Sequence, residues 1–217
     1  MPAALVLARS PVPGACKTRL EPLLGPEGCA RLQAVLVARA ARWAQLAAPD
    51  AAFVSFSPAD AVESMSRLVP DGVRLFPQVD GGLGDRIAAA AEHVLGVAGG
   101  PLLVAGADVV ALGPEHAAAA FDDLAHGCDL TIGPATDGGY YLIGLGEPRP
   151  DLFALAAEEW GGPQVLRLTL TTAASAGLRV GLLRAERDLD EPADVRALLA
   201  DPLTPDDVRA ALGGETR

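Results

Sequence analysis

The chain has few aromatic residues and few histidines, and it lacks several catalytic motifs. Only 4% of its 217 residues are aromatic although half are hydrophobic, so Ala, Val, Leu and Ile must build the core. Its three histidines form no H-x-x-x-H pattern, and no G-x-S-x-G occurs. Zinc hydrolases and serine hydrolases of the common kinds are therefore excluded. No G-x-G-x-x-G follows a predicted strand, which argues against a Rossmann dinucleotide site.

Cysteine is equally scarce. The three cysteines are far apart and form no C-x-x-C pattern, which argues against a disulfide framework or a zinc site. Cys16 lies beside Lys17 and Arg19, and such neighbours favour a lowered thiol pKa. A catalytic thiol would also need a general base, and this part of the sequence offers none.

Basic residues and long apolar runs are the remaining deficits. Lys and Arg number 17 against 28 Asp and Glu, for a net charge of −11. A field of this sign does not attract nucleic acid or anionic membranes, so we expect no nucleic-acid partner. The apolar run at residues 3–8 is too short for a signal peptide or a membrane span, and no other run approaches about 18 residues. We therefore expect no membrane span and a cytoplasmic location.

Hydrophobic patterning predicts strands alternating with helices. Strands are predicted at residues 3–8, 52–56, 73–76, 101–105, 130–133, 140–145 and 178–183. Helices are predicted at residues 26–46, 84–97, 114–125, 163–176, 192–200 and 205–212, the first beginning at a proline. Alternation of this kind is typical of βαβ units and a mostly parallel sheet. Without repeats or linkers, the sequence predicts one α/β domain over residues 1–217.

The loop after the first predicted strand concentrates positive charge in an acidic protein. Arg9, Lys17 and Arg19 lie within eleven residues. Backbone N–H groups around Pro13, Gly14 and Thr18 could wrap phosphates while the cations supply charge. Because ligands of open α/β sheets bind beyond the carboxyl ends of strands, we interpret this loop as a nucleotide-binding segment. The alternative is a surface loop with solvated charges.

Carboxylates follow two other predicted strands. Asp108 comes just after the strand at 101–105, and Asp188 and Asp190 follow the strand at 178–183. Alternation places the side chains of Asp188 and Asp190 on one side of an extended segment. Three such carboxylates would suit Mg²⁺ or Mn²⁺. The alternative is that they cap the helices that follow.

Two more junctions carry polar residues. Asp137-Gly138-Gly139-Tyr140 lies between two predicted strands and would form a hairpin turn. Its glycines would also let a ligand lie against the backbone, with Asp137 and Tyr140 as polar partners. At a strand-to-helix junction, Gln78 and Arg86 could face the same cleft.

These segments together resemble a known family. The motifs are P-x-P-G-x-x-K-T-R-L in the loop from Arg9 to Leu20, and G-P-A-x-D-G-G-Y-Y-L-I-G from Gly133 to Gly144. Weaker ones are residues 83–86, 106–108 and 188–194, and Trp160 with Val165. The chain resembles bacterial GT-A-like nucleotide-diphospho-sugar transferases, some of them assigned to arsenosugar biosynthesis. That group is related to the 2-phospho-lactate guanylyltransferases.

The resemblance implies a three-layer α/β/α sandwich with a mixed, mainly parallel sheet. It also implies that a nucleotide binds near the N-terminal loop and that Asp108, with Asp188 and Asp190, holds Mg²⁺ or Mn²⁺. The chain departs from the family pattern around the metal turn, where Ala107 and Val110 replace the usual Ser and Pro. It departs again after Trp160, where two glycines replace small hydroxyl residues.

The leading functional hypothesis is glycosyl transfer from a nucleotide-diphospho-sugar to a small-molecule acceptor. Lys17, Arg19 and Asp108 would carry the catalysis, by stabilising the leaving group directly or through the metal. The first alternative is nucleotidyl transfer from an NTP to a phosphorylated small acid. The second is a degenerate, non-catalytic nucleotide-binding subunit. No pattern in the sequence sets the oligomeric state.

Overall fold

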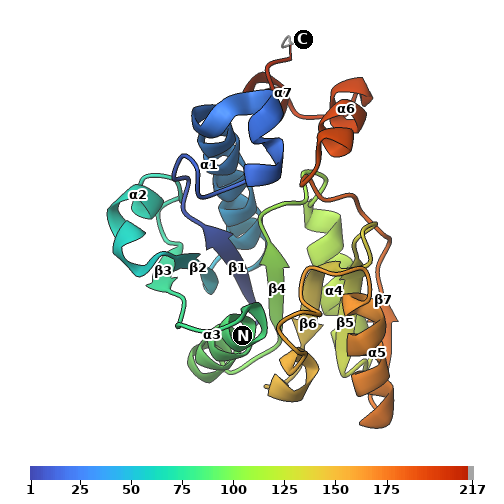
Figure 1. Cartoon of the computed structure of the whole chain (residues 1–217). Helices are drawn as coiled ribbons and strands as arrows, with labels where there is room; N and C mark the ends of the chain where they lie inside the picture. The colour runs from blue at the N-terminus through green and yellow to red at the C-terminus, as the bar shows by residue number, and fades with distance from the viewer. Residues whose placement is uncertain (215–217) are drawn as a thin grey trace.

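The computed structural model describes residues 1–214, and one twisted sheet runs through them (Figure 1). The sheet has seven strands in the order β3-β2-β1-β4-β6-β5-β7. The strands are β1 (Ala3–Arg9), β2 (Ala52–Ser57), β3 (Arg74–Pro77), β4 (Leu102–Gly106), β5 (Leu130–Pro134), β6 (Tyr140–Leu145) and β7 (Val180–Leu182). Residues 215–217 of the predicted domain lie outside the described residues.

The helices alternate with these strands as the sequence predicts, except for one short helix at Val62–Ser66 that the pattern does not predict. The α-helices are α1 (Glu21–Ala47), α2 (Val62–Ser66), α3 (Leu83–Ala98), α4 (Pro114–Ala125), α5 (Val165–Ser175), α6 (Pro192–Ala200) and α7 (Asp206–Ala211). Three short 3-10 helices are η1 (Thr18–Leu20), η2 (Ala59–Ala61) and η3 (Pro150–Phe153). Within residues 1–214, no helix combines the length and the apolar character that a membrane crossing requires.

The sheet is mixed and mainly parallel. β1 pairs in parallel with β2 and β4, β2 with β3, and β5 with β7. Only β6 among the described strands runs against its neighbours, β4 and β5. The parallel strands end at a common edge, and the loops that follow β1 and β4 therefore meet there.

Helices cover both faces of the sheet, which confirms the three-layer prediction. Buried residues of α1 and α4 pack on one face, among them Trp43 and Ala120. Buried residues of α3 and α5 pack on the other face, among them Ile87 and Ala173. Alanine is frequent in both layers, so helices and sheet approach closely without large aromatic side chains.

The beginning of α1 differs from the prediction. The sequence predicts a loop through residue 25, but residues 18–24 form η1 and the first turn of α1. Gly25 then interrupts the helix with φ 65° and ψ 167°, a conformation that glycine adopts without steric cost. The regular helix resumes at Pro26, the predicted start.

A third apolar cluster lies beside the main core and joins the loops at the sheet edge. Leu20 of η1, Val110 after β4 and Leu189 after β7 are all buried in it. Helices α6 and α7 add Val195 and Val208. Each of the first three residues lies one to three positions from a predicted site residue. Burial of these side chains therefore fixes the polar loops to one another.

Candidate functional site

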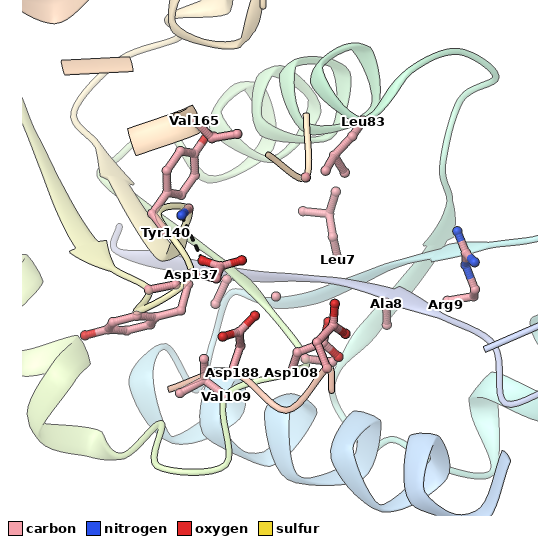
Figure 2. Close-up of a pocket in the computed structure, with 18 of the residues that line it drawn as sticks. Leu7, Ala8, Arg9, Leu83, Asp108, Val109, Asp137, Tyr140, Val165 and Asp188 are labelled. Atoms are coloured by element: carbon pink, nitrogen blue, oxygen red, sulfur yellow. Dashed lines mark hydrogen bonds between the residues drawn. The ribbon is translucent and has the colours of Figure 1, made fainter. Parts of the chain in front are cut away.

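A cleft of about 450 Å³ opens at the carboxyl ends of β1 and β4. It gathers eight of the residues predicted from sequence: Arg9, Lys17, Asp108, Asp137, Gly139, Tyr140, Asp188 and Asp190. Figure 2 shows the carboxylates of Asp108, Asp137 and Asp188 together on one side of this space, with Leu7 and Leu83 across from them. The structure thus brings four separate segments of the sequence into one site.

Lys17 lies at the centre of the charged part of the cleft. Its side chain is only 4% exposed. Its ammonium group donates to Asp190 Oδ1 at 3.1 Å and to the carbonyl oxygen of Leu189 at 2.6 Å, and it lies 2.7 Å from Asp108 Oδ1. An ammonium has three N–H donors, and all three thus have acceptors. Burial works to lower the pKa of Lys17, but the two carboxylates outweigh it and raise that pKa above its ordinary value.

The backbone also joins the two acidic segments. The amide of Leu189 donates to the carbonyl oxygen of Asp108 at 2.9 Å. Leu189 is fully buried in the third apolar cluster, while its neighbours Asp188 and Asp190 both line the cleft. The predicted alternation of this segment is therefore confirmed. Arg19 closes the arrangement from outside, with Nη1 3.2 Å from Asp190 Oδ2.

Asp188 differs from its neighbours because it has no cation. Among residues 1–214, no Lys or Arg lies within ion-pair distance of Asp188 or of Asp137. Burial, followed by the negative charge of Asp137, raises the pKa of Asp188 to about 6. The fold thus holds an ionised carboxylate at neutral pH in surroundings that disfavour its charge.

The raised pKa of Asp188 makes the stability of the metal-free protein depend on pH. Since the folded pKa of Asp188 exceeds the unfolded value, its contribution to stability is lost as pH rises through about 6. We expect Asp188→Asn to raise Tm by a few degrees at about pH 8 and to leave it nearly unchanged at about pH 4. Thermal unfolding in EDTA at both pH values measures this. An equal Tm change at the two pH values would contradict the assignment.

The carboxylates also bear on the predicted divalent metal. Within residues 1–214, no three carboxylate, imidazole or thiol side chains are already arranged around a metal position. The ammonium of Lys17 instead lies between Asp108 and Asp190. Asp108 is 46% exposed and Asp188 has no cationic partner, so both offer oxygens of the kind Mg²⁺ and Mn²⁺ prefer. These donor oxygens fit a divalent cation whose remaining coordination positions are filled by oxygens of a bound ligand.

The Asp137-Gly138-Gly139 turn has its predicted hairpin role. It connects β5 to β6 as a hairpin, and Asp137 Oδ1 accepts a hydrogen bond from the Gly139 amide at 2.8 Å (dashed in Figure 2). Asp137 and Gly139 line the cleft. The prediction that both glycines admit a ligand is wrong for Gly138. That residue has φ 96°, and a Cβ there would lie 2.3 Å from the carbonyl oxygen of Pro163. Gly138 makes room for the chain itself.

The remaining predicted residues lie around the cleft and do not line it. Gly14 has a positive φ of 76° in the turn where the Ala15 amide donates to the carbonyl oxygen of Val12. Gln78 donates to the carbonyl oxygens of Ala8 and Ser55, so it ties β3 to β1 and β2. Arg86 donates to the carbonyl oxygen of Gly81. Four more predicted residues lie outside the cleft lining: Pro13, Thr18, Arg19 and Gly138.

The environment of Cys16 corrects one expectation. Burial, together with the nearby Cys29, raises the pKa of the Cys16 thiol above its ordinary value, although Lys17 and Arg9 act in the opposite direction. The thiol donates to the carbonyl oxygen of Val12. The prediction of a lowered pKa is therefore wrong, because desolvation outweighs the two cations.

Sequence reasoning missed Gln33 and most of an apolar wall. Gln33 of α1 is buried, lines the cleft and donates to the carbonyl oxygen of Arg9 at 3.0 Å. A glutamine next to Leu32 on the buried face of a helix is a polar residue that needs a partner, and this signal was in the sequence. The apolar wall of the cleft consists of Leu7, Leu83, Ile87, Ile143, Trp160 and Val165. Figure 2 shows Leu7 and Leu83 across from the carboxylates.

Gly84 holds this wall together at the first turn of α3. A Cβ there would lie 2.2 Å from the carbonyl oxygen of Phe153 and 2.9 Å from Trp160 Nε1. We expect Gly84→Ala to lower the free energy of unfolding by about 1–3 kcal/mol, because the backbone of η3 must move. Urea unfolding measures the change. Gly96→Ala, on the same helix, is the control, since a Cβ there meets nothing within 4 Å. Equal effects of the two substitutions would contradict this packing.

Comparison with known proteins places the chain in a family. Residues 39–161 match a family described as uncharacterised proteins conserved in bacteria (DUF2064), and this match covers more than half of the chain. The chain belongs to the DUF2064 family. Comparison of this DUF2064 protein with curated proteins gave no significant match.

Several solved structures similar to this DUF2064 protein are described as transferases or synthetases. A candidate nucleotide-diphospho-sugar transferase from Desulfovibrio desulfuricans G20 has a TM-score of 0.83 at 27% identity, over 98% of this chain and 94% of that one. A nucleotidyl transferase from Methanothermobacter thermautotroptrophicus has a TM-score of 0.54 at 21% identity, over 91% and 95%. A CMP:2-keto-3-deoxy-manno-octonic acid synthetase complexed with CTP has a TM-score of 0.52 at 16% identity, over 92% and 98%. The last two, at such identities, show the fold alone, which is of the nucleotide-diphospho-sugar transferase type.

Proposed function

We propose that this protein is a metal-dependent glycosyltransferase that uses a nucleotide-diphospho-sugar donor. The observation that carries the proposal is the convergence of Arg9, Lys17, Asp108 and Asp188 on one cleft at the carboxyl edge of the sheet. Cations and carboxylates together suit a diphosphate bound with a divalent metal. The likeness to the candidate nucleotide-diphospho-sugar transferase supports the choice of donor.

The residues of the cleft divide the work of binding. Arg9 and the loop that carries Lys17 and Arg19 face the diphosphate. Asp108 and Asp188 would hold Mg²⁺ or Mn²⁺. Asp190 pairs with Lys17 through Oδ1 and with Arg19 through Oδ2, and it would support the metal site by holding these two cations in place. The metal, when bound, supplies a Lewis acid that stabilises negative charge on the departing diphosphate.

Transfer itself exchanges one bond at the anomeric carbon of the sugar. The acceptor hydroxyl forms the new carbon–oxygen bond, and the bond to the diphosphate oxygen breaks. The hydroxyl proton passes to the cleft carboxylates and then to solvent, and the nucleoside diphosphate leaves. Asp137 would orient the sugar or the acceptor, because only Oδ1 is engaged by the Gly139 amide and the second oxygen is left for the ligand.

Nucleotidyl transfer is the second candidate. The nucleotidyl transferase and the synthetase complexed with CTP share the fold, and this observation favours it. In this reaction a phosphorylated small acid would attack the α-phosphate of an NTP and release pyrophosphate. The same cations and metal would serve both reactions.

A product assay tests the two candidates against each other. The wild-type protein with Mg²⁺ or Mn²⁺ is incubated with nucleotide-sugars or with NTPs and candidate acceptors. Release of nucleoside diphosphate from a nucleotide-sugar supports glycosyl transfer. Pyrophosphate release from an NTP, dependent on a phosphorylated acid, would replace it with nucleotidyl transfer. Nucleotide binding that needs neither metal nor Asp108 would favour the non-catalytic alternative.

A further inference from the structure

The cleft has an acidic side and an apolar side, and the apolar side has no role in holding a diphosphate. One side carries Asp137 and Asp188 without a cation of their own. The other is the apolar wall defined above, in which Leu83 is 46% exposed. Figure 2 shows Leu83 and Leu7 facing the carboxylates across the open space, with Val165 beside Tyr140 at the same end.

The acidic side of the cleft, with Asp137 and Asp188, is negatively charged. Four carboxylates line the cleft as a whole, against two cations, Arg9 and Lys17. The charge of Lys17 is taken up by Asp108 and Asp190, and Arg9 donates to the carbonyl oxygen of Ala15. No cation of residues 1–214 therefore compensates Asp137 or Asp188, and a metal held by Asp188 would still leave Asp137 without a cation. A bound metal and diphosphate add no net positive charge, since a diphosphate carries at least as much charge as one divalent cation.

We propose that the space between the apolar wall and the carboxylates of Asp137 and Asp188 binds the acceptor. The acceptor is an uncharged or cationic molecule with an apolar ring or chain. Its apolar body lies on the wall formed by Leu83, Trp160 and Val165. Its hydroxyl or amino group donates to Asp137 or Asp188. A phosphorylated or carboxylated acceptor is disfavoured, because a second anion a few ångströms from these carboxylates is repelled.

Calling the bound molecule an acceptor rests on the proposed glycosyl transfer. The test of its binding needs neither nucleotide nor metal. Trp160 lines the cleft and reports on it by fluorescence, whereas Trp43 is buried in the main core and gives a constant background. Three probes share one ring and differ in charge: benzyl alcohol, benzylamine and benzyl phosphate. Trp160→Phe shows which part of the signal comes from the cleft.

We expect benzyl alcohol and benzylamine to change the Trp160 signal, and benzyl phosphate to bind at least about fivefold more weakly. Asp137→Asn combined with Asp188→Asn should remove that difference. Leu83→Asn should weaken all three probes, while Val97→Asn, an equally exposed position at the other end of α3, should not.

Three results would overturn the inference. The first is that no probe changes the Trp160 signal. The second is that benzyl phosphate binds as tightly as benzyl alcohol. The third is that free nucleosides displace benzyl alcohol, since the wall would then hold the base of the donor. If one of these results is found while nucleotides still raise Tm, the inference fails and the proposed function stands. If the probes bind as expected but no nucleotide raises Tm, only the proposed function fails.

Discussion

Replacing Lys17 by methionine should weaken nucleotide binding by roughly 1.5–3 kcal/mol, about 10- to 150-fold in Kd. Methionine keeps an unbranched apolar chain of similar length but removes the ammonium. Two carboxylates, Asp108 and Asp190, then face each other without the cation that lies 2.7 and 3.1 Å from them. The anionic ligand loses its nearest buried positive charge at the same time.

Titration calorimetry with the best-binding nucleotide measures the change. Arg187→Met is the matched control, because Arg187 is half exposed, pairs with Asp194 and does not line the cleft. Thermal unfolding of both variants separates lost binding from lost folding. Unchanged nucleotide affinity in folded Lys17→Met protein would remove Lys17 from the site.

Asp108→Asn should lower metal-dependent turnover by at least about a hundredfold while the fold is kept. Asparagine has the same shape but no charge, so one of the two carboxylates assigned to the metal becomes a neutral amide that binds a divalent cation much more weakly. The fold should persist because Ala107 and Val110, on either side, stay buried in their apolar clusters. The residues that replace the family's Ser and Pro thus anchor this turn by packing.

Initial rates with Mg²⁺ and with Mn²⁺ measure this effect. Asp60→Asn, at an exposed position of η2 that does not line the cleft, is the control. Turnover of Asp108→Asn close to that of the control would show that the metal, if one is used, is held elsewhere.

The architecture could be predicted because each strand and helix carries its own local pattern. The runs at residues 52–56 and 140–145 are apolar, short and bounded by turns, and both became strands of the sheet. Leu189 between two aspartates also gave the right geometry, since one buried side chain fixes where its neighbours point. Local signals of this kind need no knowledge of the rest of the chain.

What could not be predicted depends on contacts between distant residues. The sequence predicts that Lys17 lies on a nucleotide-binding loop or, as the alternative, on a solvated surface loop. Neither pattern shows that its ammonium is buried against residues 172 and 173 positions away. Gly138 suggests room for a ligand, but the backbone of Pro163 fills the space there. The thiol pKa of Cys16 likewise depends on burial, which the neighbouring cations in the sequence do not reveal.

The most direct test of the central claim is the thermal stability of the wild-type protein with a panel of nucleotide-sugars and NTPs, each with and without Mg²⁺ or Mn²⁺. A ligand that binds only the folded state raises Tm. We expect that at least one nucleotide-sugar raises Tm, that the rise needs the metal, and that Asp108→Asn abolishes it. No rise with any compound at millimolar concentration, or an equal rise in Asp108→Asn without metal, would contradict a metal-dependent nucleotide site in this cleft.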